Sequence, residues 1–237
     1  MEYGRNIPAG LGMAALAHDL RTPMCVAAGA AQMALDAGGK DVSQQLHQIL
    51  QAVGAMDRML SMMSDLPEEA GCRVFTAEML REELLAMTAG KAGCKGQRLS
   101  IDLSAIEGLM MEADYAALCR LLTNLLGNAV KYTQEGGMIA VRAQLERNRM
   151  RPGHMRVRFV VSDNGMGMTR AFMRRMYMPF ARARETEGIP GSGLGLSITR
   201  DMAARLNAAI RVRSERGRGT TFIVHVPMKI HMKRRIC

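Results

Sequence analysis

Two rows of apolar residues, with steps that alternate between four and three, constrain the N-terminal part of this chain more than any other feature. The first row consists of Met13, Ala17, Leu20, Met24, Ala27, Ala31 and Ala34, and the second of Val42, Leu46, Ile49, Val53, Met56, Leu60 and Met63. This spacing is typical of the seam of a coiled coil or a four-helix bundle. The short segment AGGKD (37–41) separates the rows, so we predict an antiparallel helical hairpin. One hairpin has too little core to be stable alone, and we therefore expect two chains to pair as a homodimer.

Proline and glycine residues affect the first predicted helix at two places. Pro8, Gly10 and Gly12 make the residues before Met13 unfavourable for helix. Pro23 lies inside the first predicted helix, where it removes a backbone hydrogen bond and is expected to kink the helix.

After Pro67 the pattern changes to alternating strands and helices. Strands are predicted at 73–75, 98–103, 137–145, 156–162, 208–215 and 220–227, and helices at 76–89, 115–133, 170–176 and 194–207. Thr76 is a suitable N-cap for the first of these helices. We therefore predict an α+β protein: a helical hairpin over 10–66, an α/β sandwich over 67–230, and a basic tail over 231–237. The closing segment KIHMKRRIC (229–237) has no apolar face, so we expect it to be frayed.

Charge is distributed unevenly along the 237 residues, which carry a net charge of +10. Residues 1–136 contain 11 basic and 16 acidic side chains, whereas residues 137–237 contain 21 and 6. A basic half can attract nucleic acid, or it can be an arginine-rich solvated surface. We favour the solvated surface and expect no nucleic acid, because no compact basic helix and no interleaved aromatic residues are present.

Two further observations bear on the compartment. No apolar run approaches the ~20 residues that span a bilayer, so we expect no membrane segment in this chain. The five cysteines are scattered and lack CxxC spacing, which favours reduced thiols in a cytoplasmic protein.

Asn124 and Asn128 are four residues apart and therefore share one face of a predicted helix. Two carboxamide oxygens in a row can hold a hard cation such as Mg²⁺, and Lys131 on nearly the same face can meet a phosphate. Taken alone, however, two such asparagines are more often capping or surface residues.

Two glycine-rich segments follow. DNGMGM begins at Asp163, directly after an apolar strand, where a carboxylate can accept a hydrogen bond from an exocyclic amine such as that of adenine. Gly165 and Gly167 would let a flat ring lie against the backbone, although a single DNG is usually an ordinary turn. GSGLGLS (191–197) leads into a helix, whose N-terminal N–H groups favour phosphate. Phe180, in the polar connection between the two segments, is expected to anchor a lid or simply to belong to the core.

The order of these motifs, preceded by HDLRTP at His18, resembles the sensor histidine kinases of bacterial two-component systems. The resemblance extends from about Met13 to Pro227 and includes the closing SERGRGTTFIVHVP. It implies a dimeric phosphoacceptor hairpin followed by an ATPase domain of the histidine kinase and gyrase type.

The resemblance also implies residue roles. His18 would accept the γ-phosphoryl group of ATP, with Asp19 as the neighbouring base. Thr22, one turn further on, would position a water that hydrolyses the phosphorylated regulator, so phosphatase activity is an additional expectation. Asn128 would be the main Mg²⁺ ligand. The remaining expected nucleotide-site residues are Asn124, Lys131, Tyr132, Asp163, Gly165, Gly167, Phe180, Gly191, Gly193, Leu194 and Gly195.

The expected activity is thus ATP-dependent autophosphorylation of His18, followed by transfer to an aspartate of a response regulator. The resemblance also implies that Asn124 stands where ATPases of the same fold, such as those of the gyrase type, carry a glutamate that activates water. Because an amide cannot act as this base, Asn124 favours phosphoryl transfer over hydrolysis. The chain begins shortly before the hairpin, so it is expected to be either a kinase served by a separate sensor protein or the catalytic portion of a longer one. A degenerate kinase that only binds nucleotide and scaffolds a partner, and a nucleic-acid-binding ATPase, are the alternatives.

Overall fold

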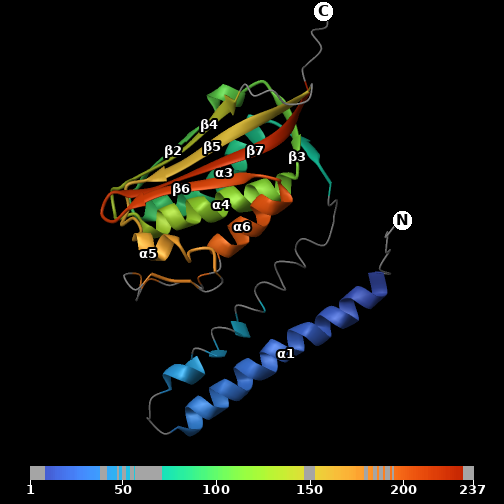
Figure 1. Ribbon diagram of the computed structural model, residues 1–237, viewed down its shortest axis with the longest axis vertical. Coiled ribbons are helices and arrows are strands. Elements are labelled where there is room, and N and C mark those ends of the chain that lie inside the picture. Colours follow the sequence, from blue (N-terminus) through green and yellow to red (C-terminus); the bar gives the residue numbers. More distant parts are fainter. Residues whose placement is uncertain are drawn as a thin grey trace, which may run out of the picture. The chain divides into compact units, whose positions relative to one another are not determined.

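The computed structural model describes residues 9–37, 42–46, 48–49, 52–53, 56, 71–146, 153–178, 181–183, 186, 189, 193 and 195–231, with only the backbone for 9–22. The chain divides into two compact units, Met1–Ala70 and Gly71–Cys237. Figure 1 shows the elements of each unit.

In the first unit, helix α1 (Ala9–Asp36) is continuous across Pro23. It also includes Gly10 and Gly12, so the expectation that the first dozen residues resist helix formation was wrong from Ala9 onward. Each glycine costs about 1 kcal/mol relative to alanine, which a helix of this length can offset through its other residues. Residues 43–46, 48–49, 52–53 and 56 are helical, within the second apolar row. Val42 lies just before this helical segment, and Leu60 and Met63 lie outside the described residues. No helix in the described part of the chain is at once long and apolar enough to cross a bilayer.

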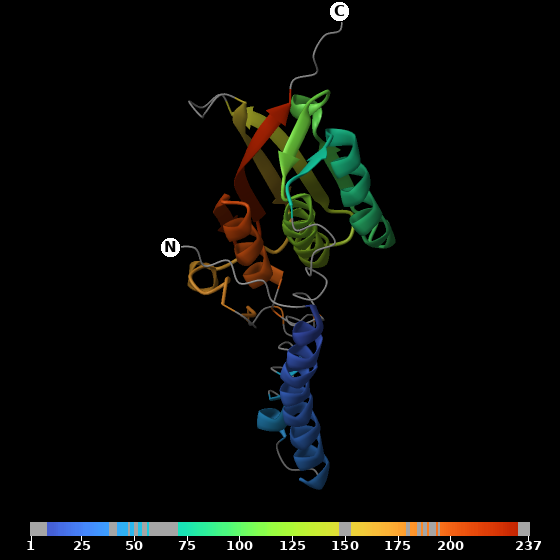
Figure 2. The same ribbon diagram turned by 90° about the vertical axis from the view of Figure 1, so that its right-hand side faces the viewer.

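The second unit is a mixed sheet with helices on one face, as Figures 1 and 2 show. Among the described residues the sheet has seven strands, in the order β1-β3-β7-β5-β4-β2 with β6 also paired to β7. The strands are β1 (Arg73–Phe75), β2 (Arg98–Asp102), β3 (Met110–Ala113), β4 (Met138–Glu146), β5 (His154–Asp163), β6 (Ala209–Glu215) and β7 (Gly219–His231). The α+β class predicted from the sequence is confirmed.

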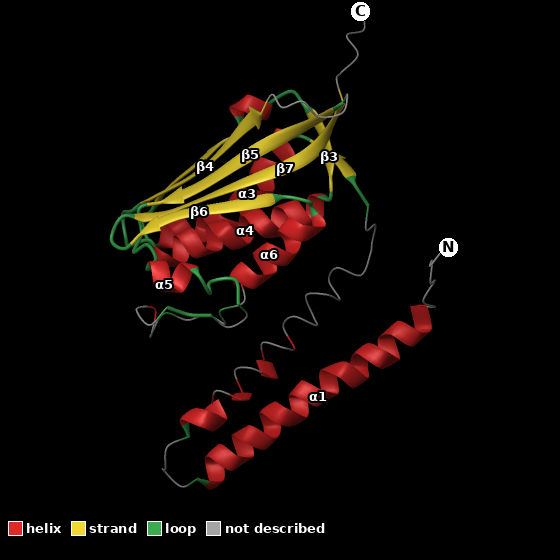
Figure 3. Ribbon diagram, viewed as in Figure 1, coloured by secondary structure: helices red, strands yellow, loops and turns green. Residues whose placement is uncertain are grey.

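Helices α3 (Ala77–Cys94), α4 (Tyr115–Tyr132) and α6 (Gly195–Arg205) cover one face of this sheet, and α4 packs between the other two. Figure 3 separates the helical layer from the sheet by colour. The short elements are η1 (Ser104–Ile106) and α5 (Arg170–Met173). Thr76 caps α3 as predicted, because its side chain accepts a hydrogen bond from the Met79 N–H at 3.4 Å. The core lies between the sheet and α4, whose buried residues are Ala117, Leu118, Leu121, Leu122, Leu125, Leu126, Ala129 and Val130.

Strand β7 differs from the prediction at its C-terminal end. It pairs with β5 along one edge, and with β6 and then β3 along the other. Met111 of β3 lies opposite Ile230, so the segment beginning at Lys229 is not frayed over its first three residues. Ile230 is buried, and its side chain anchors the segment 229–231 to the sheet although that segment has no apolar face. Residues 232–237 of the predicted tail lie outside the described residues.

Asn207, after α6, has a φ of 49°, as expected for a residue that ends a helix in the left-handed conformation.

Candidate functional site

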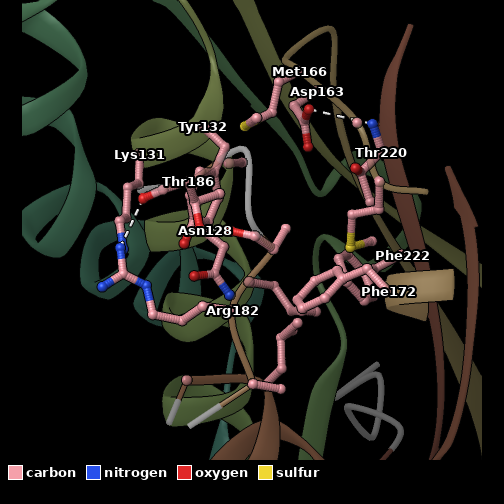
Figure 4. A pocket seen from close by; sticks show the side chains of 18 of the residues that line it. Asn128, Lys131, Tyr132, Asp163, Met166, Phe172, Arg182, Thr186, Thr220 and Phe222 are labelled. Carbon is pink, nitrogen blue, oxygen red and sulfur yellow. Dashed lines mark hydrogen bonds between the residues drawn. The ribbon is translucent and has the colours of Figure 1, made fainter. Parts of the chain in front are cut away.

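A cavity of about 260 Å³ opens in the second unit beside the C-terminal half of α4. Its lining comes from α4, the end of β5 and the loop after it, α5, the connection before α6, the start of α6, and β7. Figure 4 shows the side chains around it. The cavity brings together these residues predicted from the sequence: Asn128, Lys131, Tyr132, Asp163, Gly167, Gly193 and Gly195.

Helix α4 supplies the amide and amine groups. Asp114 caps the helix by accepting the Ala117 N–H at 3.0 Å, and the apolar face packs on the sheet, so the polar face remains for the site. Asn128 faces the start of α6: its side chain lies 3.6 Å from where a Cβ of Gly195 would stand. Asn124 does not line the cavity, and its Nδ2 atom is buried without a hydrogen-bond partner among the described residues.

The C-terminal end of α4 is held by two side chains from outside the helix. Lys95 Nζ donates to the carbonyl oxygens of Val130 and Lys131, each at 3.0 Å. Gln97 Nε2 donates to Val130 O at 3.0 Å and to Thr133 O at 2.8 Å. A cation at a helix C-terminus is favourable because the last carbonyl oxygens carry partial negative charge. These contacts fix the backbone that carries Lys131 and Tyr132.

Lys131 and Tyr132 both line the cavity and are labelled in Figure 4. The Lys131 ammonium lies 4.8 Å from the centroid of the Tyr132 ring. The ring and the ammonium thus stand together at one end of the site, where a ligand with an aromatic base and an anionic group would meet both.

Asp163 is the only carboxylate among the described residues that line the cavity. Its Oδ1 accepts the N–H of Gly165 at 2.9 Å and the N–H of Thr220 at 3.2 Å. Burial raises the pKa of this carboxyl above its usual range, although the two backbone hydrogen bonds act in the opposite direction. Within the described residues no hydrogen bond to Oδ2 is present, so this oxygen is available to a ligand.

The glycines of the DNGMGM segment serve close backbone packing. Gly165 does not line the cavity; a Cβ there would lie 2.5 Å from Tyr132 O. Gly167 has a φ of +64°, and a Cβ there would lie 2.0 Å from Glu215 O. The Met166 N–H donates to Tyr132 O at 3.1 Å, which joins this loop to the end of α4.

Several predicted residues lie beyond this description. Phe180, Gly191 and Leu194 are outside the described residues. His18, Asp19 and Thr22 lie on α1, where only the backbone is described. His18 and Thr22 are four residues apart, which places them one turn apart on the same side of the helix.

Sequence reasoning missed other residues around the cavity, among them Met166, Phe172, Arg182, Thr186, Thr220 and Phe222. Arg182 Nη2 donates to the carbonyl oxygens of Thr186 at 2.7 Å and Ile189 at 2.6 Å, so it holds the connection before α6. Thr220 follows the glycines of RGRG, a signal for a turn but not for a site, because its partner Asp163 is distant in the sequence.

The donor set of the site suits a hard cation held jointly with an anionic ligand. The described residues contain no group of three or more His, Cys, Asp or Glu side chains that could hold a metal. Carboxamide oxygens of Asn128 and Asn124 are instead the oxygen ligands that this face offers, and Mg²⁺ commonly takes one or two protein oxygens together with phosphates. The buried Nδ2 of Asn124 is a donor with no partner among the described residues, so it suits a phosphate or water oxygen rather than the cation itself.

Family models match both units. The His Kinase A (phospho-acceptor) domain matches residues 13–68, and the histidine kinase-, DNA gyrase B- and HSP90-like ATPase matches residues 113–230. The chain therefore belongs to the histidine kinase family, with a phosphoacceptor segment followed by an ATPase domain.

Individual relatives agree with this assignment. The chain is 28% identical over 92% of its length to the autoinducer 2 sensor kinase/phosphatase LuxQ of Vibrio parahaemolyticus, of which it spans 26%. It spans between 22% and 42% of the lengths of three further curated relatives.

Two solved structures share the fold. Full-length ShkA in complex with AMPPNP is 27% identical, with a TM-score of 0.60 over 93% of this chain and 46% of ShkA. The histidine kinase ThkA in complex with the response regulator protein TrrA is 21% identical, with a TM-score of 0.55 over 92% of this chain and 61% of that one.

Proposed function

We propose that this chain is an ATP-dependent protein-histidine kinase that phosphorylates His18 and passes the phosphoryl group to an aspartate of a response regulator. The observation that carries the proposal is the convergence of Asp163, Asn128 and Lys131 in one cavity at the start of α6. The same chain carries a histidine within a matched phosphoacceptor segment.

The cavity supplies complementary groups for ATP. Asp163 Oδ2 accepts the adenine amino group, and the Tyr132 ring lies near the base. Lys131 and the N–H groups at the start of α6, after Gly193, bind phosphate, because a helix N-terminus favours anions. ShkA, which shares the fold, was solved with the nucleotide analogue AMPPNP.

Asn128 would hold Mg²⁺ with Asn124 in support, and the ion would neutralise charge on the phosphates. The neutral imidazole of His18 attacks the γ-phosphorus, the bond from that phosphorus to the bridging oxygen breaks, and ADP leaves. Asp19 orients the ring and accepts its other N–H proton. Phosphoryl transfer needs mainly positioning and charge neutralisation, which these groups provide.

The partners follow from the hairpin unit. We assign residues 10–66 to a homodimeric phosphoacceptor hairpin and residues 67–230 to the catalytic domain. The response regulator is the acceptor, as TrrA is the partner of ThkA in their complex. Thr22 would position water for hydrolysis of the phosphorylated regulator, and the kinase/phosphatase LuxQ supports this activity. We place the protein in the cytoplasm, with input from a sensor region or a separate sensor protein.

Incubation of the full chain with γ-labelled ATP and Mg²⁺ tests the proposal. We expect a protein-bound label that is lost in acid and stable in alkali, as a phosphorus–nitrogen bond requires. His18→Gln should abolish the label, and Asn128→Ala should remove most of it, whereas His47→Gln in the same hairpin sequence is the matched control. Label that persists in His18→Gln, or that survives acid, would contradict the assignment.

A further inference from the structure

Two segments distant in the sequence meet beside the candidate nucleotide site. One is the loop Asp163–Met168 after β5, and the other is the end of the β6–β7 hairpin, Ser214–Thr220. The roles assigned above use the loop but leave the hairpin end without a function.

The backbones of the two segments are in direct contact. The Gly217 N–H donates to Met166 O at 2.8 Å. Gly219 has a φ of +101°, and a Cβ there would lie 2.0 Å from Asp163 O. A Cβ at Gly167 would meet Glu215 O at the same distance. Any side chain at either glycine would therefore push the loop and the hairpin end apart.

Ser214 links the two segments through its side chain. Its hydroxyl oxygen accepts the Met168 N–H at 2.8 Å. The same hydroxyl lies 3.0 Å from Gly219 O and 2.9 Å from Thr220 Oγ1, so its single proton goes to one of these two oxygens. Ser214 is opposite Thr220 in the β6–β7 register, which keeps this contact short.

Ser214 is connected to the Asp163 carboxylate through Thr220. Thr220, which Ser214 touches, donates its N–H to Asp163 Oδ1 at 3.2 Å. Met168 and Thr220 both line the cavity, whereas Ser214 does not. Figure 4 shows the Thr220 and Asp163 pair on the side of the cavity opposite Lys131. Ser214 thus reaches the cavity only through its neighbours.

We propose that Ser214 is a positioning residue for base recognition: its hydroxyl joins the Asp163–Met168 loop to the β6–β7 hairpin and thereby orients the Asp163 carboxylate toward an adenine amino group. This inference rests on the proposed ATP-binding function. Its specific consequence concerns selectivity, because a carboxylate accepts from the amino group of adenine but meets a carbonyl oxygen at the same position of guanine. Loosening Asp163 should therefore weaken ATP binding more than GTP binding.

The test uses the full chain and its Ser214→Ala variant, with affinities for Mg²⁺–ATP and Mg²⁺–GTP measured by calorimetry. Loss of this partly buried hydrogen-bond partner should raise the Kd for ATP about tenfold. The Kd for GTP should change much less, so the preference for ATP should fall. In autophosphorylation assays the KM for ATP should rise while kcat stays within about twofold of the wild type.

Three variants separate positioning from general stability. Ser214→Thr keeps the hydroxyl and should restore affinity and selectivity. Ser214→Cys keeps the size but is a weak acceptor, and it should lower the preference for ATP even if Ser214→Ala does not fold. Ser100→Ala, on the exposed side of β2, is the matched serine control and should leave both affinities unchanged.

The outcomes are distinct. Equal losses of ATP and GTP affinity, unchanged selectivity in both Ser214→Ala and Ser214→Cys, or a fall in kcat at constant KM would each overturn the positioning role. A wild-type chain that binds no ATP would overturn the proposed function and this inference together. A wild type that prefers ATP and labels His18, beside variants with unchanged selectivity, would overturn this inference alone.

Discussion

Helices α1 and α4 are both long, but they differ in how far their apolar side chains are buried. Every apolar residue in the buried stripe of α4 packs against the sheet or a neighbouring helix. In α1, of the side chains described, only Pro23 and Ala30 are buried, while Met24, Val26, Met33 and Leu35 are exposed. The α/β unit therefore completes its own core, whereas the hairpin leaves apolar surface that a second chain would cover. This contrast supports the proposed homodimer.

The largest effect on ATP affinity should come from Asp163, because this single carboxylate recognises the base. Asp163→Asn removes the charge that accepts the base amino group and should weaken ATP binding about 100-fold. The hairpin should be unaffected, so self-association measured by sedimentation should be unchanged. Asp102→Asn, at the end of β2 where the carboxylate accepts from Ser104, is the matched control. Unchanged ATP affinity in Asp163→Asn would remove Asp163 from the site.

The core comparison can be tested with one substitution in each unit. Leu121→Ala in α4, where the side chain is 0% exposed, should lower the free energy of unfolding of the α/β unit by about 3 kcal/mol. Leu35→Ala in α1, where the side chain is 77% exposed, should leave that free energy unchanged and weaken self-association. Urea denaturation and sedimentation measure the two quantities. If both variants behaved alike, the contrast between the units would be wrong.

A smaller effect is expected at the end of α4. Lys95→Met removes the ammonium that donates to the last carbonyl oxygens of the helix and should cost about 1–2 kcal/mol of stability. ATP affinity should fall as well, since Lys131 and Tyr132 stand on this turn. Lys91→Met, in the last turn of α3, is the control for lost charge. Chemical denaturation with and without ATP separates the two effects, and equal behaviour of the variants would exclude the capping role.

The smallest effect on stability is expected at Glu112, which pairs with the part of β7 that was not predicted as strand. Hydrogen bonds from Lys229 and then His231 lower the pKa of Glu112 below its ordinary 4.5. A lowered carboxyl pKa in the folded state adds stability above the unfolded value and loses it as the pH falls through the folded value. Stability should therefore decline slightly more below pH 4.5 in the wild type than in Glu112→Gln. Thermal unfolding at pH 3 to 7 measures this difference, and parallel curves would contradict it.

Local pattern was enough for most of the elements. The apolar face of α4, the alternation in β4 and β5, and the Thr76 cap are each specified by residues within a few positions of one another. Hydrogen bonds and side chains within one short segment determine these elements, so the local sequence is enough to predict them.

The errors in the α/β unit lie where distant segments decide the outcome. Strand β3 has the sequence MMEA, which carries no alternation and was not predicted. It forms because β1 and the end of β7 flank it, and the end of β7 lies far along the chain. The same pairing turns Lys229–His231 from an expected tail into strand.

The site residues also fall into a group that local sequence predicts and a group that only the tertiary contacts reveal. By itself the sequence determined the helical N-terminal region, the class of the fold, and the residue types of the asparagine and glycine motifs, because periodicity and motif order are properties of neighbouring residues. Only the tertiary structure decided that Asp163 is held by Thr220, that Gly167 and Gly219 admit the backbone of another segment, and that Ser214 joins the loop to the hairpin. These contacts depend on sheet register between β5, β6 and β7, and register is set by the burial of whole strands rather than by any local pattern.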